Sequence, residues 1–488
     1  MTQSSSDLAQ LFAGICRLEH ALALMEWDQA TLCSDAGQAA RGEAMAEIHS
    51  EIHRRLNQPW IAEALAQAPA DTAEQHRMLT LMSRRHREAS QLDEAFVRRK
   101  VTLSVACETA WRQAREESRF SHFAEAFSPL LALLKEEGAR RAEPAEAPYQ
   151  ALLKKFEPDL NLAQLNALFA PIETQLPELI QQACERSAQR SAEPLPSISV
   201  EEQKRVAERL AHQLGFDRGA GRIDVSTHPF TAGVPGDVRI TSRYDRDNLL
   251  SGFYSMIHEV GHARFEQGID TRWHQTPMAR VQSAGLHEAQ ALAFEMQLAR
   301  EPEFLDWLSQ QLQQEWGSHT ALSAANLQAH VHRVEPSLIR VEADEVTYPA
   351  HILLRLRLEQ ALLSGDLPLI DLPDAWNRGM AQLLGVTPGN DREGCLQDIH
   401  WCFAEFGYFP SYALGAMLAA QQFEGLRQQP GWQQPVPERH LWVCEQMARK
   451  IWHQGGGQDL NQVAQQISGR PLSAEPLLAH LRRRYLES

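Results

Sequence analysis

The chain is poor in cysteine, and none of its cysteines are closely paired. Its 488 residues include seven cysteines, and no two form a C-x-x-C motif, so neither a disulfide framework nor a cysteine zinc site is indicated. The sequence also lacks the run of about 18 apolar residues that a membrane-spanning helix needs. Its first residues lack the basic and apolar regions of a secretory signal. These absences predict a cytoplasmic protein without a membrane partner.

Positive charge is also scarce. Lysine and arginine number 47 against 63 aspartates and glutamates, which gives a formal net charge of −16. A surface this acidic does not attract nucleic acid or an anionic membrane, so neither is expected as the main partner. The composition is otherwise ordinary for a globular protein, with 43% hydrophobic and 23% charged residues.

Proline and glycine are absent between Thr72 and Arg119, as expected for long helices. Nearer the start of the chain, Leu8, Leu11, Phe12 and Ile15 keep the spacing of one amphipathic helical face. Similar patterns occupy most of the remaining sequence. The fold class predicted is therefore mainly α.

One stretch, residues 215–244, departs from the helical pattern. Two short alternating segments there are bracketed by glycines and predict a hairpin or small sheet. In the second segment Asp237, Arg239 and Thr241 share one face, and the two aliphatic residues between them share the other. The polar face either lines a cleft or is an ordinary solvated edge, and the pattern alone leaves both interpretations open.

The apolar run Tyr254–Phe265 contains the motif H-E-x-x-H. On a helix, residues four apart lie one turn on, so His258 and His262 direct two imidazoles at one point, as a zinc ion requires. Glu259 projects beside them, where it can act as general base towards a metal-bound water. By chance alone the motif is expected in roughly 5% of chains this long, so coincidence is the alternative.

A third metal ligand is expected from a second helix. The proline-free segment Gly285–Glu295 follows at a distance that lets the first helix end and a second return. Glu288 is the candidate ligand. Glu295, two turns further on the same face, is a candidate to support the site from behind. His287 is a rival ligand, but it points about 100° away from Glu288 on a helix.

A polar stripe follows later in the chain. Its arginines, tyrosine and histidine suit bidentate binding of a carboxylate, although a buried structural network is the alternative. Pro349 is expected to break or kink the helix within the stripe. The stripe consists of Arg340, Asp344, Tyr348, His351 and Arg355.

Beyond this stripe, His400 and Tyr408 lie close together in the segment Gly394–Tyr412. Such a pair is suited to donate hydrogen bonds to a developing oxyanion.

Five motifs in this order resemble the signatures of the M32 metallocarboxypeptidases, the family of thermostable carboxypeptidase 1. The resemblance spans nearly the whole chain, including Leu24–Thr31 and Tyr149–Leu153. The departures are Ala289 in place of a common serine, Cys33–Ser34 in place of Met-Pro, and Ala404 in place of a common glycine; none removes a predicted ligand or base. The motifs are D-x-R-x-T at Asp237–Thr241, H-E-x-x-H at His258–His262, H-E-x-Q at His287–Gln290, I-R-x-x-A-D at Ile339–Asp344 and G-x-x-Q-D-x-H-W at Gly394–Trp401.

The resemblance implies a carboxypeptidase that releases C-terminal residues from peptides with broad preference. It implies one divalent metal ion per subunit, zinc or alternatively cobalt, on His258, His262 and Glu288. By the same resemblance, Glu259 activates the water, and His400 and Tyr408 stabilise the oxyanion.

The resemblance also assigns substrate binding to the two arginine motifs. Arg340 is the preferred anchor for the free α-carboxylate, with Arg239 as a second candidate, because the segment of Arg340 also carries Tyr348 and Arg355. The implied fold is a helical zincin, in which two halves flank a deep cleft with a small β-sheet at its wall. Residues 1–488 are expected to form one catalytic domain, with a helical half at about 1–200 and a metal- and substrate-binding half at about 201–488. A homodimer is expected.

Two rival functions remain on the sequence alone. One is an oligopeptide endopeptidase on the same helical zincin fold, which would need no cationic group for a free carboxylate. The other is a non-catalytic helical binding scaffold, although the metal ligands and the base are all present in the sequence.

Overall fold

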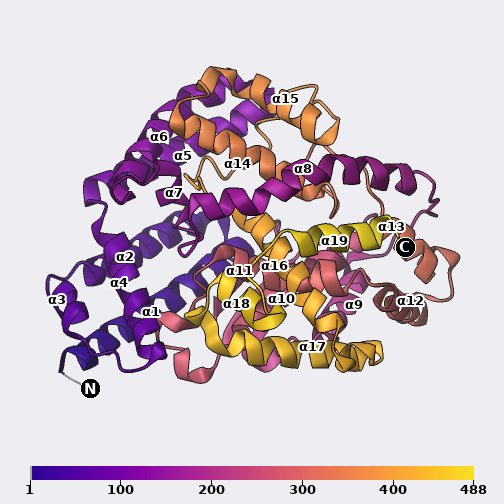
Figure 1. Ribbon diagram of the computed structural model, residues 1–488, viewed down its shortest axis with the longest axis horizontal. Helices are drawn as coiled ribbons and strands as arrows, with labels where there is room; N and C mark the ends of the chain where they lie inside the picture. The colour runs from indigo at the N-terminus through magenta and orange to yellow at the C-terminus, as the bar shows by residue number, and fades with distance from the viewer. Residues whose placement is uncertain (1–2, 488) are drawn as a thin grey trace.

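The computed structural model describes residues 3–487 and consists almost entirely of helices (Figure 1). The predicted mainly helical fold with one small sheet is confirmed. The first helices are α1 (Gln3–Thr31), α2 (Gln38–Leu56), α3 (Trp60–Gln67), α4 (Ala73–Ser90), α5 (Glu94–Glu117), α6 (Phe120–Arg141), α7 (Pro148–Leu153), α8 (Leu162–Ser187) and α9 (Val200–Gln213). After the sheet come α10 (Leu249–Gln267), α11 (Ala284–Leu292), α12 (Pro302–Trp316), α13 (Ala324–Val331), α14 (Tyr348–Ser364), α15 (Leu372–Leu384), α16 (Phe409–Arg427), α17 (Val436–Lys450), α18 (Leu460–Ser468) and α19 (Glu475–Tyr485).

The sheet has three strands in the order β1-β3-β2, formed by β1 (Gly221–Val225), β2 (Thr231–Val234) and β3 (Asp237–Ser242). β2 and β3 pair as an antiparallel hairpin, and β1 pairs with β3 in parallel. The turn of the hairpin contains Gly236 at φ +94°, a conformation that favours glycine. Val238 and Ile240 are fully buried, as the alternation predicts. The sheet packs against α10 and α1.

The N-terminal helix α1 packs into the molecule. By length and composition it is long and apolar enough to cross a membrane. One such helix near the N-terminus is only weak evidence for a membrane span. Its residues Leu8, Phe12 and Ile15 are buried in a small separate core. Ile52 and Ile61 supply the opposite side of that core from α2 and α3. The helix therefore has a packed partner for its apolar face.

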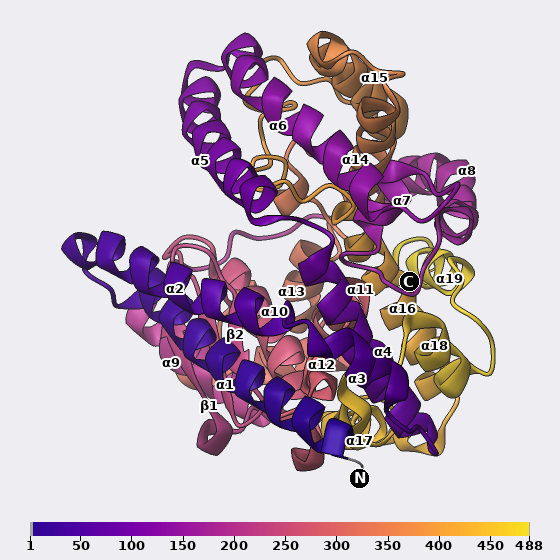
Figure 2. The same ribbon diagram turned by 90° about the vertical axis from the view of Figure 1, so that its left-hand side faces the viewer.

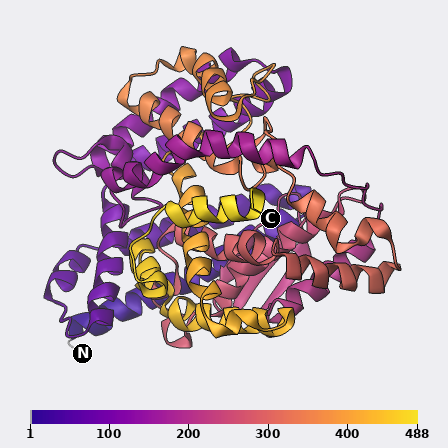
Figure 3. The same ribbon diagram turned by 45° about the vertical axis from the view of Figure 1, so that its right-hand side comes forward.

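The remaining helices form two groups that do not follow chain order. Helices α5 to α8 pack with α14 and α15, and Figure 2 shows them together above the rest. Below them α10 packs on α9 and α11, and α11 packs along α16. The C-terminal helix α19 lies against both α16 and α8, which Figure 3 shows directly above it. One continuous core extends through both groups, from Leu81 to Tyr485.

The polar stripe expected on one helix is divided between a loop and a helix. The helix α14 begins at Tyr348, and Pro349 lies in its first turn. A proline is tolerated there because the first N–H groups of a helix have no intrahelical partner. Arg340 lies before it in a short 3₁₀ turn, Arg340–Glu342. Asp344 accepts hydrogen bonds from the next backbone N–H groups, those of residues 346 and 347. Only the second half of the stripe is therefore helical.

Candidate metal centre

Three side chains from α10 and α11 converge on one point. Among the described residues 3–487, His258, His262 and Glu288 are the one group of histidine, cysteine or acidic side chains whose ligand atoms all lie within 4.8 Å of one another. The Nε2 atom of His262 lies 3.9 Å from Oε2 of Glu288. Ligands of one tetrahedral zinc ion lie roughly 3.4 Å apart. The three residues therefore fit a single divalent metal ion.

The residue behind His258 is Glu295. Its Oε2 lies 2.8 Å from Nδ1 of His258, which leaves Nε2 of that ring to face the metal position. Arg300 donates to the other oxygen of Glu295 at 3.3 Å. Glu295 lies in a π-helical turn, Ala293–Leu298, which continues α11. Such wide turns are often found at functional sites.

The electrostatic field at this point favours a cation. Burial opposes a positive charge on His258, but hydrogen bonding to Glu295 and the charge of Glu288 outweigh it and raise the pKa of His258 to about 10. A metal ion placed among the same carboxylates benefits from the same field and replaces that proton.

The glutamate of the H-E-x-x-H motif, Glu259, has only 6% of its surface exposed. Thr231 of β2 donates a hydrogen bond from Oγ1 to Oε2 of Glu259 at 2.5 Å. Burial raises the pKa of Glu259 above the usual range, although His258 and Thr231 act in the opposite direction. A raised pKa suits a carboxylate that takes up a proton and releases it again. The sheet thus forms a wall beside the general-base candidate.

Two glycines allow the ligand helices to approach closely. A Cβ atom at Gly261, inside the H-E-x-x-H motif, would lie 2.5 Å from the backbone oxygen of Gln290 on α11. A Cβ at Gly415 of α16 would lie 2.7 Å from Cγ of Glu288.

The rival ligand His287 points elsewhere: its Nε2 is 3.2 Å from Oε1 of Glu266.

The two arginines of the polar stripe meet at Asp398. Arg340 donates from Nε and Nη2 to Oδ1 of Asp398 at 3.0 and 2.9 Å. Arg355 donates from Nε to Oδ2 at 2.6 Å. Burial opposes the charge on Asp398, but the two guanidinium groups outweigh it and hold its pKa far below the usual range. The carboxylate therefore joins the two halves of the stripe that Pro349 separates.

The two arginines differ in what they can still reach. Arg355 is fully buried, and its remaining nitrogens donate to the backbone oxygen of His351 and to Oε1 of Gln397, both at 2.8 Å. It can influence a ligand only through its neighbours. The side chain of Arg340 retains 7% exposure and lies over the rings of Tyr412 and Phe409, at 5.0 and 5.6 Å.

His400 and Tyr408 lie together, with ring centroids 5.7 Å apart. Tyr412 joins them: its hydroxyl is 3.2 Å from Nε2 of His400. Burial, assisted by Arg340 and opposed by Asp398, lowers the pKa of His400 to about 4. Burial raises the pKa of Tyr408 to about 12. At neutral pH the imidazole is therefore uncharged and the phenol is protonated, so both can donate a hydrogen bond.

Arg239 lies against the N-terminal helix. Its guanidinium stacks over the ring of Trp27 at 4.3 Å and donates to both oxygens of Asp237 at 3.1 Å. Asp237 also lies 3.4 Å from Nε2 of His20. The D-x-R-x-T motif thus links the sheet to α1. Tyr348, the last predicted contact residue, packs edge-on against Tyr412.

Three residues at the site were not singled out from the sequence. Tyr412 follows Tyr408 by one helical turn, a spacing that could have identified it. Asp398 belongs to the Q-D-x-H-W motif, but nothing in the sequence shows that it pairs with Arg340. Thr231 lies on a different strand from the D-x-R-x-T motif, and only the fold brings it to Glu259.

Comparison with known proteins agrees with this geometry. A family model described as Carboxypeptidase Taq (M32) metallopeptidase matches residues 7–485. Thermostable carboxypeptidase 1 of Thermus thermophilus is 34% identical over 95% of this chain and 94% of its own length. Carboxypeptidase 1 of Bacillus subtilis is 34% identical over 85% and 84%.

Solved structures give the same result. Metallocarboxypeptidase 1 of Trypanosoma cruzi matches with a TM-score of 0.96 and 33% identity over all of both chains. A carboxypeptidase of Pyrococcus furiosus matches with a TM-score of 0.94 and 28% identity over 100% of this chain and 99% of its own. Since the family model and these relatives cover nearly the whole sequence, the chain belongs to the M32 family of metallocarboxypeptidases.

Proposed function

We propose that this metallocarboxypeptidase releases single residues from the free C-termini of peptides, with broad residue preference, through a zinc ion held by His258, His262 and Glu288. When bound, the metal supplies a Lewis acid that acidifies water and polarises the peptide carbonyl. The donor set of two imidazoles and one carboxylate is typical of catalytic zinc, and cobalt is the alternative ion.

Glu259 is assigned the role of general base. It takes a proton from the attacking water and later delivers it to the departing amine nitrogen. Its burial and its hydrogen bond from Thr231 hold the carboxylate beside the ligands.

His400 and Tyr408 are assigned to the oxyanion. Negative charge develops on the carbonyl oxygen in the transition state, and donors fixed in advance stabilise it without reorganising. The low pKa of His400 and the high pKa of Tyr408 keep both in a donating form at neutral pH. Tyr412 fixes the His400 ring from the side of Nε2.

The observation that carries the exopeptidase proposal is the sharing of Asp398. Its Oδ1 accepts both hydrogen bonds from Arg340 and lies 3.8 Å from Nδ1 of His400. The proposed anchor for a terminal carboxylate and the proposed oxyanion donor therefore lie against the same buried carboxylate. Arg340 makes the contact in this proposal, Tyr348 lines its surroundings, and Arg355 acts by holding Asp398. Arg239 remains the alternative anchor.

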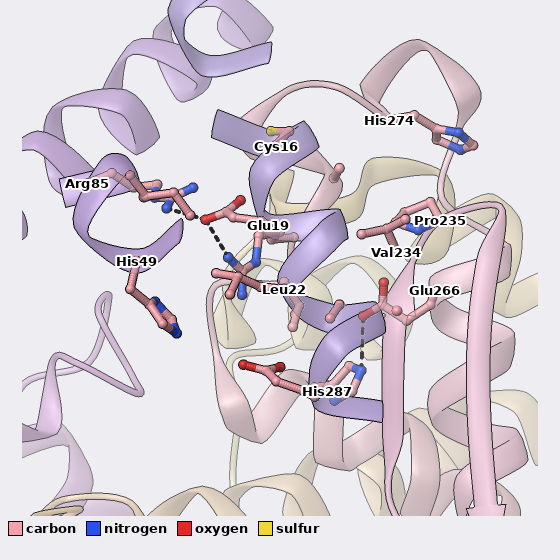
Figure 4. Close-up of a pocket in the computed structure, with 17 residues that line it drawn as sticks. Cys16, Glu19, Leu22, His49, Arg85, Val234, Pro235, Glu266, His274 and His287 are labelled. Atoms are coloured by element: carbon pink, nitrogen blue, oxygen red, sulfur yellow. Dashed lines mark hydrogen bonds and ion pairs between the residues drawn. The ribbon is translucent and has the colours of Figure 1, made fainter. Parts of the chain in front are cut away.

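A pocket on the side of α1 offers room for the rest of the peptide. It has a volume of about 380 Å³ and is bounded by Glu266 and His287 (Figure 4). The ring of His287 stacks on that of His262. On its opposite wall Glu19 accepts hydrogen bonds from Arg85 and Arg280. In this proposal, residues upstream of the cleaved bond occupy this pocket.

The decisive experiment compares one peptide with a free and an amidated C-terminus. Amidation removes the charge that Arg340 recognises, so cleavage should fall to background. Undiminished hydrolysis of the amide would support an endopeptidase instead, and no hydrolysis of either peptide by the zinc-loaded protein would support the non-catalytic scaffold. Mass spectrometry of the product ladder gives the residue preference from the same samples.

The remaining parts of the proposal concern the assembly and the cell. Family resemblance supports a homodimer, and light scattering should then give twice the chain mass of 55.0 kDa. Seven cysteines that are all free among the described residues support a reducing cytoplasm. Cell fractionation checks this location.

A further inference from the structure

A buried glutamate outside the metal centre touches both helices that build it. Glu157 follows α7 and has 1% of its surface exposed. Its carboxylate accepts three hydrogen bonds: from Ser283 Oγ at 2.5 Å, from the backbone N–H of Gly285 at 2.6 Å and from Ser411 Oγ at 2.5 Å. Burial raises its pKa to about 7, against these three donors. Because the carboxyl group is buried, removing any of these hydrogen-bond partners should cost free energy, since the group has no access to water in exchange.

The first two donors, Ser283 and Gly285, lie at the N-terminal end of α11, the helix that carries the proposed metal ligand Glu288. Ser283 caps α11, because its Oγ accepts from the N–H of Leu286 at 3.0 Å. Gly285 lies one turn before Glu288. A shift of this first turn is transmitted directly to the ligand, since a helical turn is rigid.

The third donor lies at the N-terminal end of α16, the helix that follows Tyr408 and contains Tyr412. Ser411 lies in the first turn of α16, three residues after Tyr408 and directly before Tyr412. The N-terminal ends of α11 and α16 carry partial positive charge, so one carboxylate at both ends is electrostatically favoured. The two ends are in close contact there: a Cβ at Gly285 would lie 3.2 Å from the backbone oxygen of Ser411.

We propose that Glu157 is a positioning residue that fixes α11 and α16 relative to each other, so that the metal position held by Glu288 and the hydroxyl of Tyr408 stay aligned on the same substrate carbonyl. The inference rests on the roles proposed above for those two residues. Glu157 touches neither the ligand atoms nor the donor groups and acts only through Ser283, Gly285 and Ser411. Catalytic geometry is sensitive to such shifts, because a displacement of about 1 Å can cost about 100-fold in rate.

The test is Glu157→Gln, which keeps the shape but replaces one accepting oxygen by an NH₂ group. Zinc affinity, from competition with a chromophoric chelator, should fall about 10-fold, in the range seen when support of a metal ligand is lost. The kcat value should also fall at least 10-fold, with KM changed less than threefold. Ser411→Ala removes the α16 contact alone, so it should lower kcat and leave zinc affinity within twofold.

Glu359→Gln is the matched control. Glu359 is equally buried and also accepts three hydrogen bonds, from Tyr149, Trp401 and the N–H of Gly407, but it contacts no residue of α11 through them. Its variant should lose thermal stability comparably while keeping zinc affinity. If Glu157→Gln changes Tm alone and leaves both zinc affinity and kcat as in the wild type, the residue is merely structural and the proposal is overturned.

Two further variants test the roles proposed for Glu288 and Tyr408 independently of Glu157. Glu288→Ala should abolish stoichiometric zinc binding, and Tyr408→Phe should lower kcat with zinc retained. If these two variants behave like the wild type, the assigned site is wrong whatever the Glu157 variants show. If they behave as expected and Glu157→Gln does not, only the positioning role fails.

Discussion

Glu295 Oε2 lies 2.8 Å from Nδ1 of His258, and this contact decides which nitrogen of the histidine faces the proposed metal position. The glutamate comes from the π-helical turn that continues the helix of Glu288. A proposed metal ligand, Glu288, and the group that orients another proposed ligand, His258, therefore lie on one continuous helix. This arrangement makes the metal site sensitive to changes that remove no ligand.

Replacing Glu295 with glutamine should weaken zinc binding while the ligands stay in place. The amide is uncharged and accepts a weaker hydrogen bond from His258, so affinity should fall about 10- to 100-fold. Chelator competition measures this directly. Wild-type affinity in Glu295→Gln would show that the contact does not support the ligand.

Glu259→Gln should have the opposite pattern. Because Glu259 is not a ligand, elemental analysis should still find one zinc ion per chain. Loss of the general base should lower kcat by about 10²- to 10⁴-fold. Turnover within a fewfold of the wild type would refute the assigned role.

The sequence predicted the convergence of His258, His262 and Glu288 because one helical period determines most of its geometry. His258 and His262 needed only the spacing of four, and Glu288 needed only a second helix that returns to the first. A small sheet within residues 215–244 was likewise predicted from glycines and strict alternation, but its third strand, β2 (Thr231–Val234), was not, and the two predicted segments pair in parallel instead of forming the hairpin. Local patterns of this kind predict the folded structure well because they depend on residues close together in the sequence.

Long-range pairing could not be predicted in the same way. Arg340 and Arg355 were expected on one helical face, but Pro349 starts the helix between them, and Asp398 reunites them from 43 residues beyond Arg355. The contacts of Glu157 span 126 to 254 residues of sequence. Such pairs follow from tertiary packing, for which no single-sequence pattern exists.

Arg340→Ala should weaken catalysis chiefly on substrates with a free carboxylate. The loss in kcat/KM should be about 100-fold, as for removal of one member of a buried charge pair. Amidated peptides, which do not use the anchor, should show no further loss. Arg239→Ala is the control, because Arg239 is held by Asp237 and Trp27. If Arg239→Ala gives the larger loss, the anchor is Arg239.

Gly415→Ala should disturb the metal site by steric pressure alone. The added methyl group would lie 2.7 Å from Cγ and 2.8 Å from Cβ of Glu288, closer than real contacts allow. The glutamate must move, so zinc affinity should fall and stability should drop by about 1–3 kcal/mol.

The control for this variant is Gly42→Ala in α2. A Cβ there meets nothing within 4 Å, so the substitution should stabilise the helix by about 0.5–1 kcal/mol and leave zinc affinity unchanged. Equal zinc affinity in Gly415→Ala and the wild type would show that α16 yields instead of Glu288.

Glu137 should make stability depend on pH. Its buried carboxylate accepts hydrogen bonds from Lys100 Nζ at 2.6 Å and Arg141 Nε at 2.9 Å, and Lys155 Nζ lies 3.5 Å away. Burial alone would raise its pKa, but Lys155, Lys100 and Arg141 outweigh burial and lower the pKa of Glu137 to about 2. The folded protein therefore releases this proton more readily than the unfolded chain, whose glutamates titrate near about 4.3.

The sign follows from this difference. Above pH 5 the carboxylate is ionised in both states, and its contacts contribute about 3 kcal/mol to the free energy of unfolding. As the pH falls from about 5 towards 2, the unfolded chain takes up the proton first, so this contribution is lost. Glu137→Gln should therefore be about 3 kcal/mol less stable than the wild type at pH 7, and the gap should narrow at pH 4. Urea unfolding at pH 7, 5 and 4 measures both effects.

Glu136→Gln separates this effect from general acid sensitivity. Glu136 is the adjacent residue of α6, but its side chain is 38% exposed and pairs with Arg99 and Arg140 at the surface. Exposed pairs contribute only about 0–1 kcal/mol, so this variant should stay close to the wild type at every pH. A gap for Glu137→Gln that stays constant between pH 7 and pH 4 would show that its stabilisation comes from packing, because only an ionised carboxylate gives a difference that follows the titration.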